Sequence, residues 1–137
     1  MATVRDVVSR ALRLIGVAAS DVPVDATDAA NGLEALNSML RSWEARGVYI
    51  GHDTDYTLNS TFETGLLPDR YRDPTTYLLA EALAIEYGRP LTMSLSKRIS
   101  ESWKTISANY LSPVNLDVDD GLKRMPSQRW GFRSGRR

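Results

Sequence analysis

The chain has 137 residues, 17 basic and 17 acidic side chains, a formal net charge of zero and no cysteine. This length fits one domain with one core, and the lack of cysteine excludes disulfides and thiolate metal sites. No apolar run approaches the roughly 20 residues that cross a bilayer, and residues 1–6 lack the layout of a signal peptide, so we expect a protein that stays in a cytosol or in a particle assembled there.

Two amphipathic helices are predicted first. Thr3 is a typical N-cap with Asp6 as its capping-box partner, and Gly16 is a typical residue just past a helix end. The second helix begins at Asp25 or Thr27 and closes at Gly47. In both helices apolar residues recur at steps of three and four, the period of one buried face. These residues are Val4, Val7, Val8, Ala11, Leu12 and Ile15, then Ala29, Leu33, Leu36, Leu40 and Trp43.

Residues 48–73 have a different character. Strand-like residues surround the turn signal Asn59-Ser60, which indicates a small hairpin or a protruding loop. A connection of about 25 residues is long for a compact domain, and such loops often carry function. We therefore expect this segment to contact another protein subunit through its large side chains, Tyr49, Ile50, Tyr56 and Phe62.

Two further helices complete the predicted body. Asp73-Pro74 indicates a helix start, with an N-cap followed by proline. The residues from Tyr77 to Tyr87 are apolar on almost every face, which predicts a central helix. The last helix starts near Ser94 and ends before Pro113, with a stripe at Leu95, Ile99, Trp103, Ile106 and Tyr110. The sequence thus predicts an all-α, four-helix-bundle-like body over residues 1–111 and an extended tail over 112–137.

The tail has no periodic apolar pattern. Its last fifteen residues, 123–137, carry six basic side chains and no acid. Residues 1–122 hold 11 basic and 17 acidic side chains. The formal charge is therefore +6 on the last fifteen residues and −6 on the rest of the chain. We expect the tail to take its structure on a partner protein, with aromatic residues as anchors; phosphate contacts and a solvated extension are the alternatives. The candidate binding residues are Val114, Leu116, Leu122, Lys123, Arg124, Met125, Arg129, Trp130, Phe132, Arg133, Arg136 and Arg137.

The order of these signals resembles a known family. Ala11-Leu-Arg-x-Ile-Gly16 is followed by Gly32-Leu-Glu-x-Leu-Asn-x-Met-Leu-x-x-Trp43 and by a Pro-x-x-Tyr71 turn. This pattern resembles the phage head-to-tail adaptors of the tail accessory factor type, also called packaged-DNA-stabilisation proteins. The match covers residues 1–111 and consists of helix-packing patterns, not of catalytic signatures.

The resemblance implies a structural virion protein at the head–tail junction. Such adaptors form rings, usually of twelve copies, beneath the portal protein; their C-terminal segments reach along the portal, the lower face receives the next tail component (a nozzle, stopper or terminator), and DNA passes through the channel. In a ring, Arg5, Arg10 and Arg13 are candidates to meet Glu34 or Glu44 of the next copy, although a solvated face is the plainer interpretation. No cofactor, metal or membrane is implied.

Two other classes stay open, a DNA-binding helical module and a cell-wall-degrading virion enzyme. Asp53-x-Asp55 does not begin an EF-hand, because Leu58 and Thr64 stand where glycine and glutamate are required. His52 is the only histidine, which leaves little for a metal cluster or a triad. A glycosidase needs two facing carboxylates; Glu81 and Glu86 project about 140° apart on one helix, whereas Glu44, Asp53 and Glu63 would have to meet through the fold. We expect no enzymatic activity.

Overall fold

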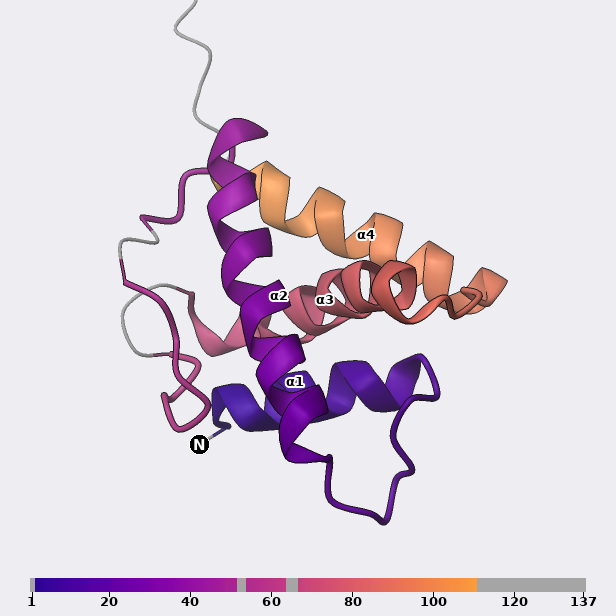
Figure 1. Ribbon diagram of the computed structural model, residues 1–137. Coiled ribbons are helices and arrows are strands. Elements are labelled where there is room, and N and C mark those ends of the chain that lie inside the picture. Colours follow the sequence, from indigo (N-terminus) through magenta and orange to yellow (C-terminus); the bar gives the residue numbers. More distant parts are fainter. Residues whose placement is uncertain (1, 52–53, 64–66, 111–137) are drawn as a thin grey trace, which may run out of the picture.

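The computed structural model describes residues 2–51, 54–63 and 67–110 (Figure 1). In these ranges the chain forms α1 (Val4–Leu14), α2 (Ala26–Ala45), α3 (Arg72–Tyr87) and α4 (Met93–Tyr110), with a single 3-10 turn, η1 (Asp69–Tyr71), before α3. The described part contains no strand, so the prediction of an all-α fold with four helices is confirmed. The predicted tail, residues 112–137, lies outside the described residues.

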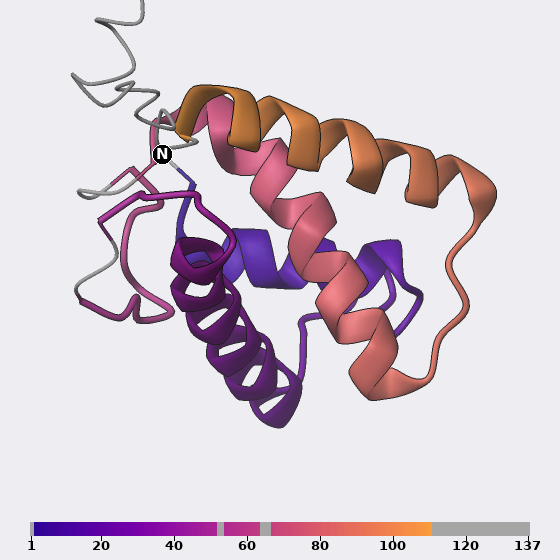
Figure 2. The same cartoon turned by 90° about the horizontal axis from the view of Figure 1, so that it is seen from above.

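Helix α3 occupies the centre of the body, as its composition predicts. It packs against α1, α2 and α4, and α1 and α2 also contact each other. After the left-handed Gly88 the chain turns, and α4 returns along α3 (Figure 2). The burial of α3 is nevertheless incomplete, since Ile85 is 77% exposed.

Helix α1 begins as predicted. The Thr3 backbone N–H donates to Asp6 Oδ2 over 2.8 Å, and the Asp6 N–H donates back to Thr3 Oγ1, which completes the capping box. These bonds from the Thr3 backbone and side chain hold the pKa of Asp6 below its ordinary value. At the other end Gly16 adopts a φ of 77°, which L side chains rarely take. All six predicted stripe residues of α1 are buried.

Helix α2 crosses α1 at a glycine. Of the two candidate caps, Asp25 is the N-cap, and its carboxylate accepts the Thr27 N–H over 3.1 Å. Further along, Gly32 faces Val8 of α1 so closely that an added Cβ would overlap Val8 Cγ1 and lie 3.5 Å from Val8 Cβ. The absence of a side chain at residue 32 therefore sets the distance between the two helices.

We expect Gly32→Ala to lower the free energy of unfolding by about 1–3 kcal/mol, the usual cost of overpacking a core. Val8 is fully buried and stiff at χ1, so it has no easy way to move aside. Chemical denaturation measures the change. In a Val8→Ala background the same substitution should be neutral or stabilising, because alanine is a better helix former than glycine by about 1 kcal/mol. An equal loss of stability in both backgrounds would contradict the close contact between residue 32 and Val8.

The predicted start of α3 is wrong by two residues. The helix begins at Arg72 with Tyr71 as its N-cap, so Asp73 is not the cap. The reason is the preceding η1 turn, in which the Tyr71 N–H donates to the Pro68 carbonyl over 2.9 Å. The chain therefore already has a helical conformation when it reaches Arg72. Pro74 then falls in the first helical turn, where its missing N–H costs no helical hydrogen bond.

The segment from residue 48 to residue 71 is a loop, and much of it is fastened to the body. Strand pairing within it, the hairpin alternative, is not seen in its described residues; a bridge joins Thr61 to Thr3 instead. The N–H groups of Val4 and Arg5, which have no partner within α1, donate to the loop carbonyls of Ser60 (2.8 Å) and Leu58 (3.1 Å). The described residues of the loop also contribute to the core Val48, Tyr56, Phe62, Leu67 and, in η1, Tyr71.

Candidate interaction surface

The last described residue, Tyr110, is held at one end of the body. Its carbonyl accepts the Tyr49 N–H over 3.2 Å, and its ring meets the Tyr71 ring edge-on at 5.2 Å between centroids. The Arg70 guanidinium lies 5.0 Å from the centre of the Tyr71 ring, within cation–π range. Burial raises the pKa of the Tyr110 phenol. The predicted tail therefore departs from a point fixed to α3, η1 and the loop.

The loop residues predicted to contact a partner divide into two kinds. Tyr49 is 54% exposed and Ile50 is half-buried, so both are available to another molecule. Tyr56 and Phe62 are instead core residues, stacked on each other with centroids 6.3 Å apart. The Tyr56 hydroxyl donates to the Phe62 carbonyl over 2.8 Å, and burial raises the pKa of Tyr56 to about 12. We therefore restrict the candidate contact to Tyr49 and Ile50.

These exposed loop residues lie where the tail begins. We call Tyr49, Ile50, Arg70 and Tyr110, together with the buried Tyr71 ring that Arg70 and Tyr110 contact, the junction surface. A hollow of about 170 Å³ borders it, lined by Leu40, Arg41, Glu44, Val48, Tyr49, Ile50 and Gly51. In Figure 1 the C-terminal ends of α2 and α4 lie at the same end of the body. One end of the molecule thus combines exposed apolar and aromatic groups with the origin of the tail.

The three tryptophans have separate places. Trp43 is 1% exposed and belongs to the core, as its stripe predicts. Trp103 meets it edge-on at 6.1 Å and is only half-buried, and the Arg46 guanidinium lies 3.6 Å from the centre of its ring. Trp130, the predicted anchor, lies beyond the described residues together with the other candidate tail residues.

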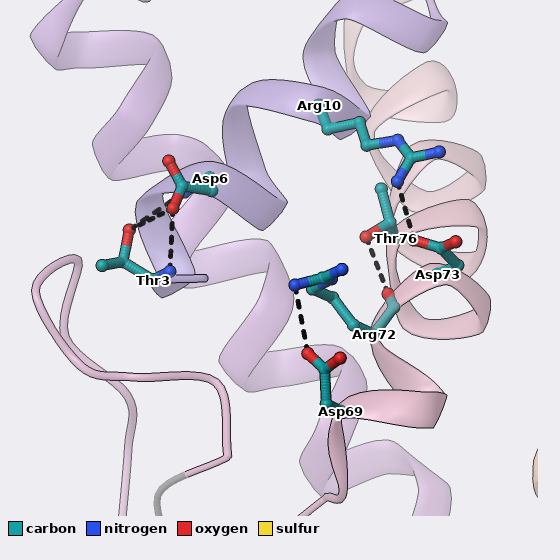
Figure 3. A network of polar contacts seen from close by, with 7 residues as sticks. All are labelled: Thr3, Asp6, Arg10, Asp69, Arg72, Asp73 and Thr76. Atoms are coloured by element: carbon teal, nitrogen blue, oxygen red, sulfur yellow. Dashed lines mark hydrogen bonds and ion pairs between the residues drawn. The ribbon is translucent and has the colours of Figure 1, made fainter. Parts of the chain in front are cut away.

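A charged network joins α1 to the start of α3 (Figure 3). Arg10 Nη1 lies 2.7 Å from Asp73 Oδ1, and Arg72 Nη1 lies 3.0 Å from Asp69 Oδ1. Thr76 Oγ1 donates to the Arg72 carbonyl over 2.8 Å. Of the three arginines of α1, Arg10 thus forms an ion pair with a residue of the same chain. This pair links α1 to α3 at the surface.

The described residues include four of the carboxylates considered for catalysis, Glu44, Glu63, Glu81 and Glu86. They contain no group of three or more histidine, cysteine or carboxylate side chains able to hold a metal ion. Glu81 and Glu86 line different hollows, one between α3 and α4 and one between α2 and α3. His52 and Asp53 are outside the described ranges, so the set Glu44, Asp53 and Glu63 stays a prediction. No described helix has the length and apolar character needed to cross a membrane.

Some residues of the candidate surface escaped the sequence-based prediction. Arg70, Tyr71 and Tyr110 were not expected to act together, although Tyr71 follows the Pro-x-x-Tyr turn and Tyr110 ends the α4 stripe. Asn37 of α2 bonds to the Tyr56 backbone in the loop. Nothing in the sequence marks it as a contact to the loop.

The described residues form a small all-α body, and the last of them, Tyr110, is held by contacts with Tyr49 and Tyr71. No protein-family model matches the chain, and no curated protein matches its sequence.

Proposed function

We propose that the chain is a structural subunit of a phage head-to-tail adaptor ring. It docks beneath a portal, joins the portal to the next tail component, and helps to retain packaged DNA in the virion. The proposal is supported by the resemblance of residues 11–43 to such adaptors and by the all-α fold. The number of copies, twelve in the family that the chain resembles, is part of the proposal.

The observation that carries the proposal is the anchoring of Tyr110 at the junction surface. Residues beyond it carry six basic side chains and the aromatic residues Trp130 and Phe132, and they have no periodic apolar pattern. A partner that bound these residues would pull on Tyr110, whose contacts reach α3 and the loop through Tyr71 and Tyr49. A load on the junction would therefore be shared by the whole body and not by α4 alone.

The energetics of the docking follow from the composition of the tail. Ordering a chain costs about 1–2 kcal/mol per residue, so the apolar anchors Val114, Leu116, Leu122, Trp130 and Phe132 have to be buried on the portal to offset that cost. The basic residues then pair with acidic groups of the portal. In a ring every copy docks at once, which converts weak individual contacts into a durable junction.

The test compares the full chain with a version that ends at Leu111, each sized alone and with the portal protein of the phage that encodes it. We expect both to be folded helical monomers alone, and only the full chain to form a ring on the portal. The body should survive truncation, because the core that the described residues form draws on all four helices and the residues after 111 have no periodic apolar pattern. Circular dichroism gives the control for folding.

Three outcomes would count against this function. A truncated chain that binds the portal as well as the full one would remove the tail from the mechanism. A full chain that ignores the portal would remove the adaptor role. Tight, steeply salt-dependent binding to duplex DNA without a portal would favour the DNA-binding module instead.

A further inference from the structure

A hollow lies between α2 and α3 on the described surface. It has a volume of about 600 Å³ and is lined by Asn31, Glu34, Ala35, Ser38, Met39, Ser42, Ala82 and Glu86. Small side chains line much of it, and both charged residues are exposed glutamates, one on each helix. Ile85, which is 77% exposed, lies one turn from Ala82 on α3. We call this the acidic groove.

A second surface of the same chain has the opposite charge. Arg5, Ser9 and Arg13 follow one another along α1 at steps of four, so they share a face of the helix. Arg13 Nε donates to the Ala19 carbonyl over 3.3 Å, which holds the next loop beside the helix. Leu14 and, in that loop, Val22 are exposed apolar groups, 36% and 54% accessible. We call this the basic face.

Among the described residues, no ion pair neutralises the charges on these two surfaces. Across residues 2–51, 54–63 and 67–110, neither Arg5 nor Arg13 forms an ion pair, and neither do Glu34 and Glu86. Arg10 differs, because Asp73 already neutralises it. Other exposed charges, such as Lys97, Arg98 and Lys104 on α4, also lack an ion pair among the described residues, but these two surfaces combine charges of opposite sign, two arginines on one and two glutamates on the other, with exposed apolar side chains nearby in the sequence.

We propose that the acidic groove of one copy receives the basic face of the next copy. The assignment rests on the proposed ring and names its lateral contact. Glu44, the other glutamate considered for this role, borders the hollow at the junction surface and lies outside the groove. Two different surfaces that pair between identical chains form a head-to-tail contact, which closes into a ring when its rotation permits. A twofold dimer would need one surface that matches itself.

Charge reversal tests this pairing in the full-length chain. One variant carries Arg5→Glu and Arg13→Glu, the other Glu34→Lys and Glu86→Lys. Each alone places like charges at every lateral contact, and we expect at least about a tenfold rise in the subunit concentration needed to fill a portal. An equimolar mixture of the two variants should recover assembly, since every contact in an alternating ring then joins opposite charges.

Two controls keep the result specific. Lys104→Glu reverses an exposed charge on α4 outside both surfaces and should leave assembly unchanged. Melting of each variant alone shows whether its subunit is still folded.

The outcomes separate the inference from the proposed function. If the wild type fills the portal and both reversed variants fill it equally well, the lateral contact is wrong and the adaptor role stands. If no form binds the portal, sedimentation of the free chain at millimolar concentration provides the same comparison. Self-association in the wild type and in the mixture, but in neither variant alone, would support the contact. Identical behaviour of all four samples would overturn it.

Discussion

Replacing Phe62 with alanine should lower the free energy of unfolding by about 3–5 kcal/mol, the usual cost of deleting a large buried aromatic side chain. Phe62 lies in a loop, yet it is fully buried and stacks on Tyr56. Its N–H also donates to the Ala2 carbonyl over 3.1 Å, which ties the loop to the chain before α1. Loss of the ring would leave a cavity and loosen that attachment. Equilibrium denaturation in urea measures the change.

Tyr49→Ala is the matched control, because Tyr49 is an aromatic residue of the same connection that is 54% exposed. We expect it to change the unfolding free energy by no more than about 0.5 kcal/mol, as surface substitutions do. Its effect should appear in portal or partner binding, where the exposed ring lies beside the origin of the tail. Equal destabilisation by the two substitutions would mean that Phe62 contributes no more to the core than its exposed neighbour.

The helices were predictable because their signals are local. The capping box of Thr3, the glycine after Ile15 and the three-four spacing of the α1 stripe all act within a few residues, and the structure shows each of them. The start of α3 was missed because the residues directly before it form a turn that competes with its signal. Asp73-Pro74 reads as a cap and first turn, but the η1 turn coils the chain earlier and frees Asp73 to meet Arg10.

The loop could not be predicted from its own sequence. Tyr49 and Phe62 are both aromatic residues of the same connection, so the sequence alone does not distinguish them. Phe62 is buried because of the residues that it contacts in the folded chain. Those partners come from the other end of the chain, since the loop caps the N-terminal amides of α1 some 55 residues earlier in the sequence. The alternation around Asn59-Ser60 predicts strands, but the pairing that forms instead is with Thr3.

The sequence predicted some residues of the candidate surface but not that they lie together. An exposed aromatic at Tyr49 and a tail after Tyr110 were expected separately, but their meeting depends on where α4 ends relative to the loop, which is a tertiary property. The acidic groove is likewise invisible in the sequence, because Glu34 and Glu86 are 52 residues apart and only the packing of α2 on α3 brings them to one hollow.

A second substitution tests the attachment of the loop from the helix side. The Asn37 side chain of α2 accepts the Tyr56 N–H over 2.9 Å and donates to the Tyr56 carbonyl over 3.1 Å, and the asparagine is buried. Asn37→Ala removes both bonds at once. Removing the side chain that satisfies a buried backbone group costs about 1–3 kcal/mol, so the loss of these two bonds should lower the unfolding free energy by roughly 2–6 kcal/mol.

The amides within the loop should report the same loss. Hydrogen exchange at Tyr56 and at its neighbours should accelerate more than exchange in α4, because the bonds that hold the loop fail before the helices do. Asn109→Ala is the control, since that exposed side chain bonds only to Thr105 of its own helix. If Asn37→Ala proved as mild as Asn109→Ala, the loop would be held by Phe62 and its apolar neighbours alone, and the polar clamp would be incidental to the fold.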